Sequence, residues 1–363
     1  MERDRVLTVD ELKRLESSRA RNPRRDEKYA FWAGPMPSPN ERPEYHASVK
    51  KLYDDFLQPP VEYVDAYHPI VSGAPVFNET IQDILIRNAL YVVADLSLPR
   101  HDVVFEIGFG LAAGIQTIFY FDAGSSIRRK YPNESTRFAT LNELKKLLPP
   151  EIGDVIFAQP PRHIPEGKRA TRSSLEKLAP WFNSNVHSPG LRLSRRQCCK
   201  IHFEDRKCEY ARELAKLSRD SVERYYFINF QEGHEEQERH VETLLKRRGL
   251  VSVKDLTSIV ESSSPLCRSC FFLHAADRVI VDGTSALTYN EEAAESAFIL
   301  GMAVAIAGKA NKGPAKRKGT KKSTKIKMLY QEGVGTIGMF AGGRASWQSR
   351  RWRDQIAREL EGW

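Results

Sequence analysis

The stretch ILIRNALYVVADLSLPRHDVVFEIGFGLAAGIQTIFYFD, residues 84–122, decides the predicted fold. Two apolar runs within it, Tyr91 to Ala94 and Thr117 to Phe121, have the length and composition of buried strands. Between them we expect a polar loop and then a helix that carries Glu106 in its first turn. A strand, a helix and a second strand form the repeating unit of a parallel sheet. Ligand sites in such sheets lie beyond the carboxyl ends of the strands.

The residues before this stretch show the same alternation of apolar strands and helices. Apolar strands are expected before Gly34-Pro35 in YAFWAGPMPSPNER and in VEYVDAYHPI, with one helix between them and another leading into the quoted stretch. Alternating strands and helices are typical of a parallel sheet that is covered on both faces. The chain is therefore predicted to be an α/β protein with a doubly wound parallel sheet.

The pattern returns in the second half of the chain. RYYFINF resembles the first strand, and CRSCFFLHAADRVIVDGTS resembles the first part of the quoted stretch. A helix, ESAFILGMAVAIAGK, and a closing strand, KIKMLYQEG, complete the second occurrence. We therefore predict two tandem copies joined by a partly helical linker. The predicted bounds are an N-terminal arm at 1–28, a catalytic domain at 29–160, the linker at 161–218 and a second domain at 219–363.

The two copies differ where chemistry is expected. When Gly108 is aligned with Gly301, Glu106 falls opposite Ile299, and the nearest acid, Glu295, lies about one helical turn earlier. The second copy is therefore predicted to be degenerate and to serve packing, pairing or regulation. A shifted site is the alternative, and its candidate acids are Glu291, Glu292 and Glu295.

The formal net charge of +9 comes from one segment. Residues 309–327, KANKGPAKRKGTKKSTKIK, contain nine Lys or Arg and no acid, so the rest of the chain is formally neutral. A Gly-, Pro- and Ser-containing basic stretch is typical of a solvated loop. The alternative is a contact for nucleic acid or an activating protein partner, because phosphates require only accessible positive charge.

The composition is that of a soluble globular protein, with 41% hydrophobic and 28% charged residues. No apolar run has the length of a membrane span. The N-terminal residues lack the apolar core of a secretory signal. We therefore expect a cytoplasmic protein that does not bind membranes.

Five cysteines raise the question of a metal site. Cys267 and Cys270 form one CxxC pair, and further candidate ligands precede it: Cys198, Cys199, His202 and Cys208. A structural zinc site requires a second correctly spaced pair, and the CxxC here falls in a predicted helix. Reduced thiols are the favoured interpretation, and neither a metal nor a cofactor is expected.

Three carboxylates stand at the predicted strand end and helix start: Asp95, Asp102 and Glu106. A carboxylate near an anomeric carbon stabilises or traps an oxocarbenium-like state, and a second acid can protonate the leaving group. A helix N-terminus would keep Glu106 ionised, which suits a nucleophile. Each acid also has a structural interpretation, because Asp95 could cap its loop, Asp102 could cap the helix and Glu106 could complement the helix dipole.

Three motifs carry a family resemblance: WAGP after the first strand, ALYVVADLS, and DVVFEIGFGLAAG. The chain resembles the nucleoside 2-deoxyribosyltransferase-like superfamily and bacterial TIR-like domains, over residues 29–125 and more weakly over 224–332. The resemblance implies a flavodoxin-like fold and cleavage of the N-glycosidic bond of a nucleoside, a nucleotide or NAD. It also implies a homo-oligomer and a possible antiphage defence effector.

The resemblance assigns roles residue by residue. Glu106 matches the catalytic glutamate of the family, Asp95 the strand-end aspartate, and Asp102 a position where relatives have Asn or Asp. The implied substrate-binding residues are Phe31, Trp32, Gly34, Pro35, Gly108 and Phe109. Trp32 could equally fill the core, and Gly108 belongs to a run of small residues that favours close helix packing.

The sequence departs from the deoxyribosyltransferases at one point. Their Asp-x-Gly-Thr element is missing, and Asp102 lies only four residues before Glu106. This departure favours a hydrolase or an NAD-type substrate over base exchange between deoxynucleosides. The alternative function is a non-catalytic nucleotide-sensing or scaffold protein that uses the same fold.

Overall fold

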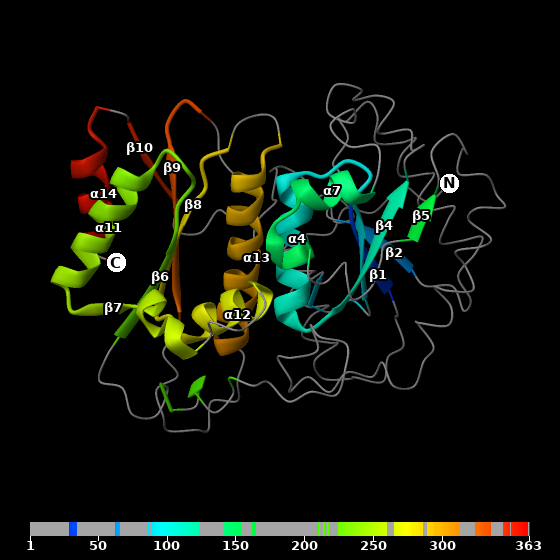
Figure 1. The fold of residues 1–363 in the computed structure, drawn as a ribbon, viewed down its shortest axis with the longest axis horizontal. Coiled ribbons are helices and arrows are strands. Elements are labelled where there is room, and N and C mark those ends of the chain that lie inside the picture. Colours follow the sequence, from blue (N-terminus) through cyan, green and yellow to red (C-terminus); the bar gives the residue numbers. More distant parts are fainter. Residues whose placement is uncertain are drawn as a thin grey trace, which may run out of the picture. The chain divides into compact units, whose positions relative to one another are not determined.

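The computed structural model describes most of the predicted strands and helices (Figure 1). The described residues are 29–34, 62–65, 86–87, 89, 91–122, 141–153, 162–164, 210, 213–214, 216–217, 224–259, 265–285, 289–311, 324–334, 344–348, 350–361 and 363. The predicted arm at 1–28, most of the predicted linker and most of the basic segment lie outside them.

The chain divides into two compact units, and each unit is assembled from separate stretches. Unit 1 contains Met1–Pro99, Ile115–Leu141 and Pro161–Leu193, and unit 2 contains Arg100–Gly114, Asn142–Pro160 and Ser194–Trp363. Helix α4, His101–Ala113, therefore belongs to unit 2, although the strands on either side of it in sequence belong to unit 1. The contiguous domain bounds expected from the sequence stay a prediction.

Unit 1 contains a five-stranded sheet in the order β2-β1-β3-β4-β5. The strands are β1 Tyr29–Ala33, β2 Glu62–Asp65, β3 Tyr91–Asp95, β4 Gln116–Asp122 and β5 Arg162–Ile164. All neighbouring strands are parallel. Every residue of β3 is buried, as expected for the central strand of a parallel sheet.

Unit 2 contains a second five-stranded sheet in the order β10-β9-β8-β6-β7. The strands are β6 Arg224–Asn229, β7 Leu250–Ser252, β8 Arg278–Asp282, β9 Lys325–Gln331 and β10 Arg344–Trp347. All neighbouring strands are again parallel. The strand starts therefore lie along one side of this sheet, which we call the amino edge, and the strand ends lie along the carboxyl edge.

Helices cover both faces of the sheet in unit 2 (Figure 1). On one face lie α11, Glu235–Arg247, and α14, Trp352–Glu361, and on the other lie α12, Pro265–Ala275, and α13, Glu291–Asn311. Alternation along β6 explains this arrangement, because Tyr226 and Ile228 join the core formed with α11 and α14 while the intervening residues face the other way. The protein is thus a mixed α/β protein with parallel sheets, compatible with a Rossmann- or flavodoxin-like class.

Helix α13 is apolar almost all round because both of its sides are covered. It contacts β8 and β9 on one side and α4 along the other. The crossing of α4 and α13 is built on two glycines. A Cβ on Gly108 would lie under 3.0 Å from the carbonyl oxygen of Phe298, and a Cβ on Gly301 would lie equally close to that of Phe105. Only glycine permits so close an approach of the two backbones.

Most strand and helix predictions are confirmed, with local exceptions. The run VSVKDL, residues 251–256, is typical of a single strand, but only its first residues belong to β7 and the chain continues as a 3-10 helix, Val253–Ile259. KIKMLYQ does form β9, but β10 follows it and closes the sheet. The run DVIFA, residues 154–158, is typical of an edge strand but lies outside the described residues, as do the helix expected between β1 and β2 and most of the helix expected before β3. No helix among those described is long and apolar enough to cross a membrane.

Candidate functional site

Two of the predicted catalytic acids lie on helix α4. The helix begins after Arg100, whose extended backbone makes no side-chain cap, and it ends at Gly114 in the left-handed conformation with φ of 77°. Asp102 and Glu106 are four residues apart, so they lie one turn apart on the same face of the helix. This face is distinct from the side of Phe105 and Gly108, which meets α13.

Asp102 is held in an environment that favours its protonated form. Burial raises the pKa of this carboxyl to about 6, although a hydrogen bond from the Val103 N–H and the nearby Arg100 act in the opposite direction. The Val103 nitrogen lies 3.0 Å from the Asp102 Oδ1. The predicted N-cap role is wrong, because Arg100 is the N-cap and Asp102 lies inside the first turn. A carboxyl with a pKa of about 6 can donate a proton near neutral pH.

Glu106 lies deeper in the helix than predicted. Because α4 begins at His101, Glu106 falls in the second turn, and the prediction of a first-turn position is wrong. The stabilising effect of the helix N-terminus decreases within the first turn, so it does not determine the state of this group. Glu106 is buried, with only 3% of its surface exposed.

Asp95, at the end of β3, belongs to unit 1. It is 2% exposed, and its Oδ1 accepts a hydrogen bond of 2.8 Å from the backbone N–H of Ser97. This geometry is an Asx turn, in which an aspartate orders the loop that follows it. Asp95 therefore has the structural role considered for it, which is to order the loop after β3. A role in binding substrate would be additional to this one.

The predicted substrate-binding residues of the first strand also belong to unit 1. Phe31 and Trp32 are successive residues of β1, so their side chains point to opposite faces of the sheet, and both are buried. Gly34 is partly exposed just after the strand. Pro35 lies outside the described residues. Burial of Trp32 agrees with the core-filling alternative.

On α4, Gly108 lies against the backbone of Phe298 and Phe109 is buried. Gly108 therefore serves helix packing, the interpretation that the run of small residues favoured. Its predicted role in substrate binding has no support in this geometry.

His101, the first residue of α4, is a residue that sequence reasoning missed. Its ring stacks on Tyr289 with centroids 5.1 Å apart. Its Nε2 lies 3.4 Å from the Asn290 backbone nitrogen and accepts that N–H, so Nδ1 carries the proton and donates to the Ser285 hydroxyl at 3.0 Å. Burial lowers the pKa of His101 to about 4. In this tautomer His101 cannot accept the Ser285 proton, so the pair does not form a Ser–His nucleophile.

A second polar cluster lies at the carboxyl edge of the sheet in unit 2. Asp282 ends β8 with no exposed surface, and its Oδ2 lies 2.5 Å from the Nδ1 of His234. The Nε2 of His234 lies 3.3 Å from the Oε1 of Gln331, the last residue of β9. The hydrogen bond with Asp282 raises the pKa of His234. The other oxygen of Asp282 accepts a 2.9 Å hydrogen bond from the Thr284 N–H, the same turn that Asp95 makes with Ser97.

The shifted site considered for the second copy is only partly assembled. Glu295 accepts a 3.2 Å hydrogen bond from Asn229 at the end of β6, and Asn229 in turn accepts one of 2.9 Å from Ser296. Glu291 and Glu292 are exposed in the first turn of α13. Partial burial and the neighbouring Glu232 raise the pKa of Glu292.

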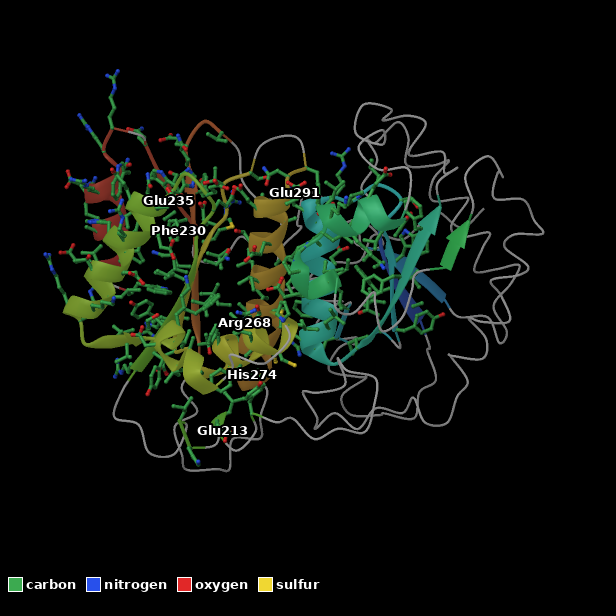
Figure 2. All side chains as sticks on the ribbon, in the orientation of Figure 1. Glu213, Phe230, Glu235, Arg268, His274 and Glu291 are labelled. Carbon is green, nitrogen blue, oxygen red and sulfur yellow. The ribbon has the colours of Figure 1, made fainter. Side chains whose placement is uncertain are left out.

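The polar cluster at the carboxyl edge of unit 2 could in part have been predicted from the sequence. Asn229, Asp282 and Gln331 are each the last residue of a parallel strand, so they must meet at one edge once those strands are adjacent. Figure 2 shows Phe230, Glu235 and Glu291 at this carboxyl edge. His234 follows β6 by a few residues and carries no motif of its own, so only the fold identifies its partner.

Metal binding receives no support within the described residues. No three His, Cys, Asp or Glu side chains there gather closely enough to hold an ion. Cys267 and Cys270 lie in α12 and form no disulfide. The remaining candidate zinc ligands lie outside the described residues: Cys198, Cys199, His202 and Cys208.

The chain matches no protein-family model, no curated protein and no solved structure. The resemblance to the deoxyribosyltransferase-like and TIR-like proteins therefore stays a prediction from the quoted motifs.

Proposed function

We propose that the protein cleaves the N-glycosidic bond of a nucleoside, a nucleotide or NAD. The observation that carries the proposal is the pair of carboxyls on one face of α4. Glu106 is buried, and one turn away Asp102 has a pKa raised to about 6. Two carboxyls one helical turn apart, one of them with a pKa that suits proton donation near neutral pH, match the pair of acids that glycosidic cleavage requires.

Each carboxyl has a defined part in the proposed reaction. As the bond from C1′ to the base nitrogen breaks, Glu106 stabilises the positive charge on C1′ or bonds to it. With a nucleoside or nucleotide, Asp102 transfers its proton to the departing base and recovers one from the attacking water, whereas the nicotinamide of NAD leaves as a neutral molecule and needs no proton. Water, or an acceptor base, then supplies the new bond to C1′. Asp95 is assigned the ribose hydroxyls on the sequence resemblance alone. The missing Gly-Thr element favours water and an NAD-type substrate.

We further propose that the two sheets are tandem flavodoxin-like copies. Three observations support a duplication: the strand orders are the same when read from each copy's first strand, Asp95 and Asp282 make the same turn, and Gly108 and Gly301 exchange the same contact. The first copy would be catalytic and the second degenerate. A homo-oligomer and a role in antiphage defence follow only from the resemblance.

The test is base release from NAD and from deoxynucleotides, measured by chromatography with purified full-length protein. We expect Glu106→Gln to lower the rate at least about 100-fold. With a deoxynucleotide as substrate, the Asp102→Asn variant should lose the decrease in rate that the wild-type protein shows as the pH rises above about 6. Glu236→Gln, which alters an exposed acid of α11, is the matched control. Undiminished activity of Glu106→Gln would refute the assignment.

A nucleotide sensor without turnover is the second candidate, and the burial of Glu106 favours it, because a substrate must reach a catalytic carboxylate. Calorimetric titration with NAD and ADP-ribose separates the two functions. Binding of NAD that persists without base release would support the sensor, whereas release of nicotinamide would support the enzyme.

A further inference from the structure

Positive charge gathers at the amino edge of the sheet in unit 2. Arg224 begins β6 and Lys325 begins β9, and both side chains are exposed. Helix α11 runs back from the carboxyl edge and ends at this same edge, where Arg248 leads through Gly249 into β7. The exposed residues Arg224, Lys246, Arg247, Arg248 and Lys325 together form what we call the amino-edge patch.

The fold brings these residues together from distant parts of the sequence. Leu250, which follows α11 directly, is the register partner of Arg224, and Lys325 is the register partner of Arg278 in the next strand. Arg278 adds a partly buried guanidinium that lies over the Trp363 ring at 5.5 Å. One short stretch of sheet edge thus carries cations from α11, β6, β8 and β9.

Nearby acids cancel part of this charge. Glu242 lies 3.8 Å from Lys246, and Glu359 forms a 3.0 Å ion pair with the buried Lys327. Asp277 accepts a hydrogen bond from the Tyr225 N–H, and Glu361 is exposed at the end of α14. Within the described residues, Arg224, Arg247 and Lys325 make no ion pair. They therefore remain available to an external anion.

The carboxyl edge carries charges of both signs, since it has exposed acids as well as the exposed Arg350, Arg351 and Arg353. The first turns of α11 and α13 carry acids there, among them Glu235, Glu236 and Glu291 (Figure 2). Figure 2 places Arg268 and His274 of α12 toward the other edge. Acids offset the arginines of the carboxyl edge, as Glu236 does for Arg353, so a polyanion should be attracted more strongly to the amino edge.

The basic segment joins this same edge at both of its ends. It begins in the last turn of α13, which runs back from the carboxyl edge, and its last residues, 325–327, lie in β9. Of its nine Lys or Arg, Lys325 belongs to the patch and Lys327 is buried beside Glu359, so the described end of the segment contributes one exposed cation that combines with those of α11 and β6. A linear polyanion suits this combination better than a membrane, since Val334 is the only large hydrophobic residue exposed among those described.

We propose that the amino-edge patch binds the phosphate backbone of nucleic acid without reading its sequence. None of the five patch residues is aromatic, and the nearby Trp363 ring is already covered by the Arg278 guanidinium, so affinity should come from phosphate contacts and depend steeply on salt. This binding is independent of the proposed N-glycosidase activity, which uses other residues.

The test compares two triple variants of the full-length chain that change the net charge equally. The first, Arg224→Gln, Arg247→Gln and Lys325→Gln, removes charge from the patch. The second, Arg350→Gln, Arg351→Gln and Arg353→Gln, removes the same charge from exposed positions at the carboxyl edge. Fluorescence anisotropy would follow a labelled mixed-sequence strand of about 30 nucleotides and its duplex, at salt concentrations of roughly 50 to 200 mM.

We expect the patch variant to bind about tenfold or more weakly than the wild-type protein, with a salt slope smaller by roughly 3. The control variant should lose much less. Circular dichroism and melting curves must match for all three proteins, and the double variant Arg247→Gln and Lys325→Gln provides a milder change if the triple variant fails to fold. Base release measured without nucleic acid should be the same in wild-type and patch variant.

Three outcomes would overturn the proposal. Equal losses in the two triple variants would show that net charge alone is responsible. Absence of binding by the wild-type protein would exclude nucleic acid as the partner. Binding to vesicles that contain phosphatidylserine, without binding to either oligonucleotide, would identify a membrane surface as the partner instead.

Discussion

His101 and Asp102 are neighbours in sequence, and burial shifts their pKa values in opposite directions. Burial lowers the pKa of His101 to about 4 and raises that of Asp102 to about 6. His101 therefore contributes stability that is complete above its unfolded pKa of 6.5 and is lost as the pH falls toward 4. Asp102 acts oppositely, because its folded form binds the proton more tightly, so stability decreases as the pH rises from 3.8 toward 6. The two effects partly cancel in the wild-type protein.

Replacing Asp102 with Asn should remove the effect of Asp102 on stability and leave that of His101. At about pH 7 the wild-type protein holds an ionised carboxylate in a buried site, which Asn avoids while it still accepts the Val103 N–H. We expect Asp102→Asn to increase the free energy of unfolding by about 1 kcal/mol at pH 7 and to leave it nearly unchanged at about pH 4. Urea unfolding at both pH values measures the difference.

The exposed Asp255→Asn substitution is the control and should show no such dependence on pH. A loss of stability in Asp102→Asn at pH 7 would contradict the assigned burial effect. An increase would fit a functional carboxyl, since catalytic groups are often retained at the expense of stability.

Helices α4 and α13 form the closest helix contact of unit 2, and glycine on both sides makes it possible. Because α13 packs against the sheet and against α4, apolar residues occupy nearly its whole circumference. This explains why its composition approaches that of a membrane helix although none of the described helices meets the requirements of a membrane span. The spacing of Phe105 to Gly108 repeats in Phe298 to Gly301, so the contact is reciprocal.

Replacing Gly108 or Gly301 with alanine should push α4 and α13 apart. In an exposed helix interior the change from Gly to Ala stabilises by roughly 1 kcal/mol, but here the new methyl group would meet a backbone carbonyl that cannot move alone. We expect Gly108→Ala and Gly301→Ala each to lower the free energy of unfolding by more than about 2 kcal/mol. Chemical denaturation measures the loss.

Gly153→Ala provides the comparison, because nothing lies within 4 Å of a Cβ built there. It should be neutral or slightly stabilising. Similar losses for Gly153→Ala and Gly108→Ala would contradict the proposed role of the crossing.

At the scale of the whole molecule, the compact units do not follow the order of the sequence. Helix α4 lies between β3 and β4 in the chain, yet it belongs to the compact unit that contains α13. His101 reinforces this membership through its contacts with Ser285, Tyr289 and Asn290. The predicted boundary near residue 218 therefore separates two helices that belong to one core.

A protease site inserted after residue 218 tests this arrangement. After cleavage, the two pieces should elute together in size-exclusion chromatography, because α4 in the first piece remains packed on α13 in the second. The isolated 219–363 fragment should bind the dye ANS more strongly than the nicked pair, since α13 would lose its cover. Separate elution of the two pieces would contradict the prediction.

Much of the fold was predictable from the sequence because its determinants are local. Short buried runs such as YVVAD specify strands, and the order of strands and helices specifies parallel sheets. The turns after Asp95 and Asp282 are also local, because an aspartate side chain readily accepts a hydrogen bond from the backbone N–H two residues further on. The helix start was misplaced because Arg100 provides no capping side chain that would mark it.

The sequence by itself determined the strands, the helices and the candidate acids Asp95, Asp102 and Glu106. Tertiary structure alone decided that Gly108 packs on α13, that His234 pairs with Asp282 and Gln331, and that the cations of the amino-edge patch share one edge. The physical reason is how far apart in the sequence the interacting residues lie. Strand and helix formation depend on neighbours in the chain, whereas burial, pKa shifts and the meeting of strand ends depend on which elements become adjacent after folding.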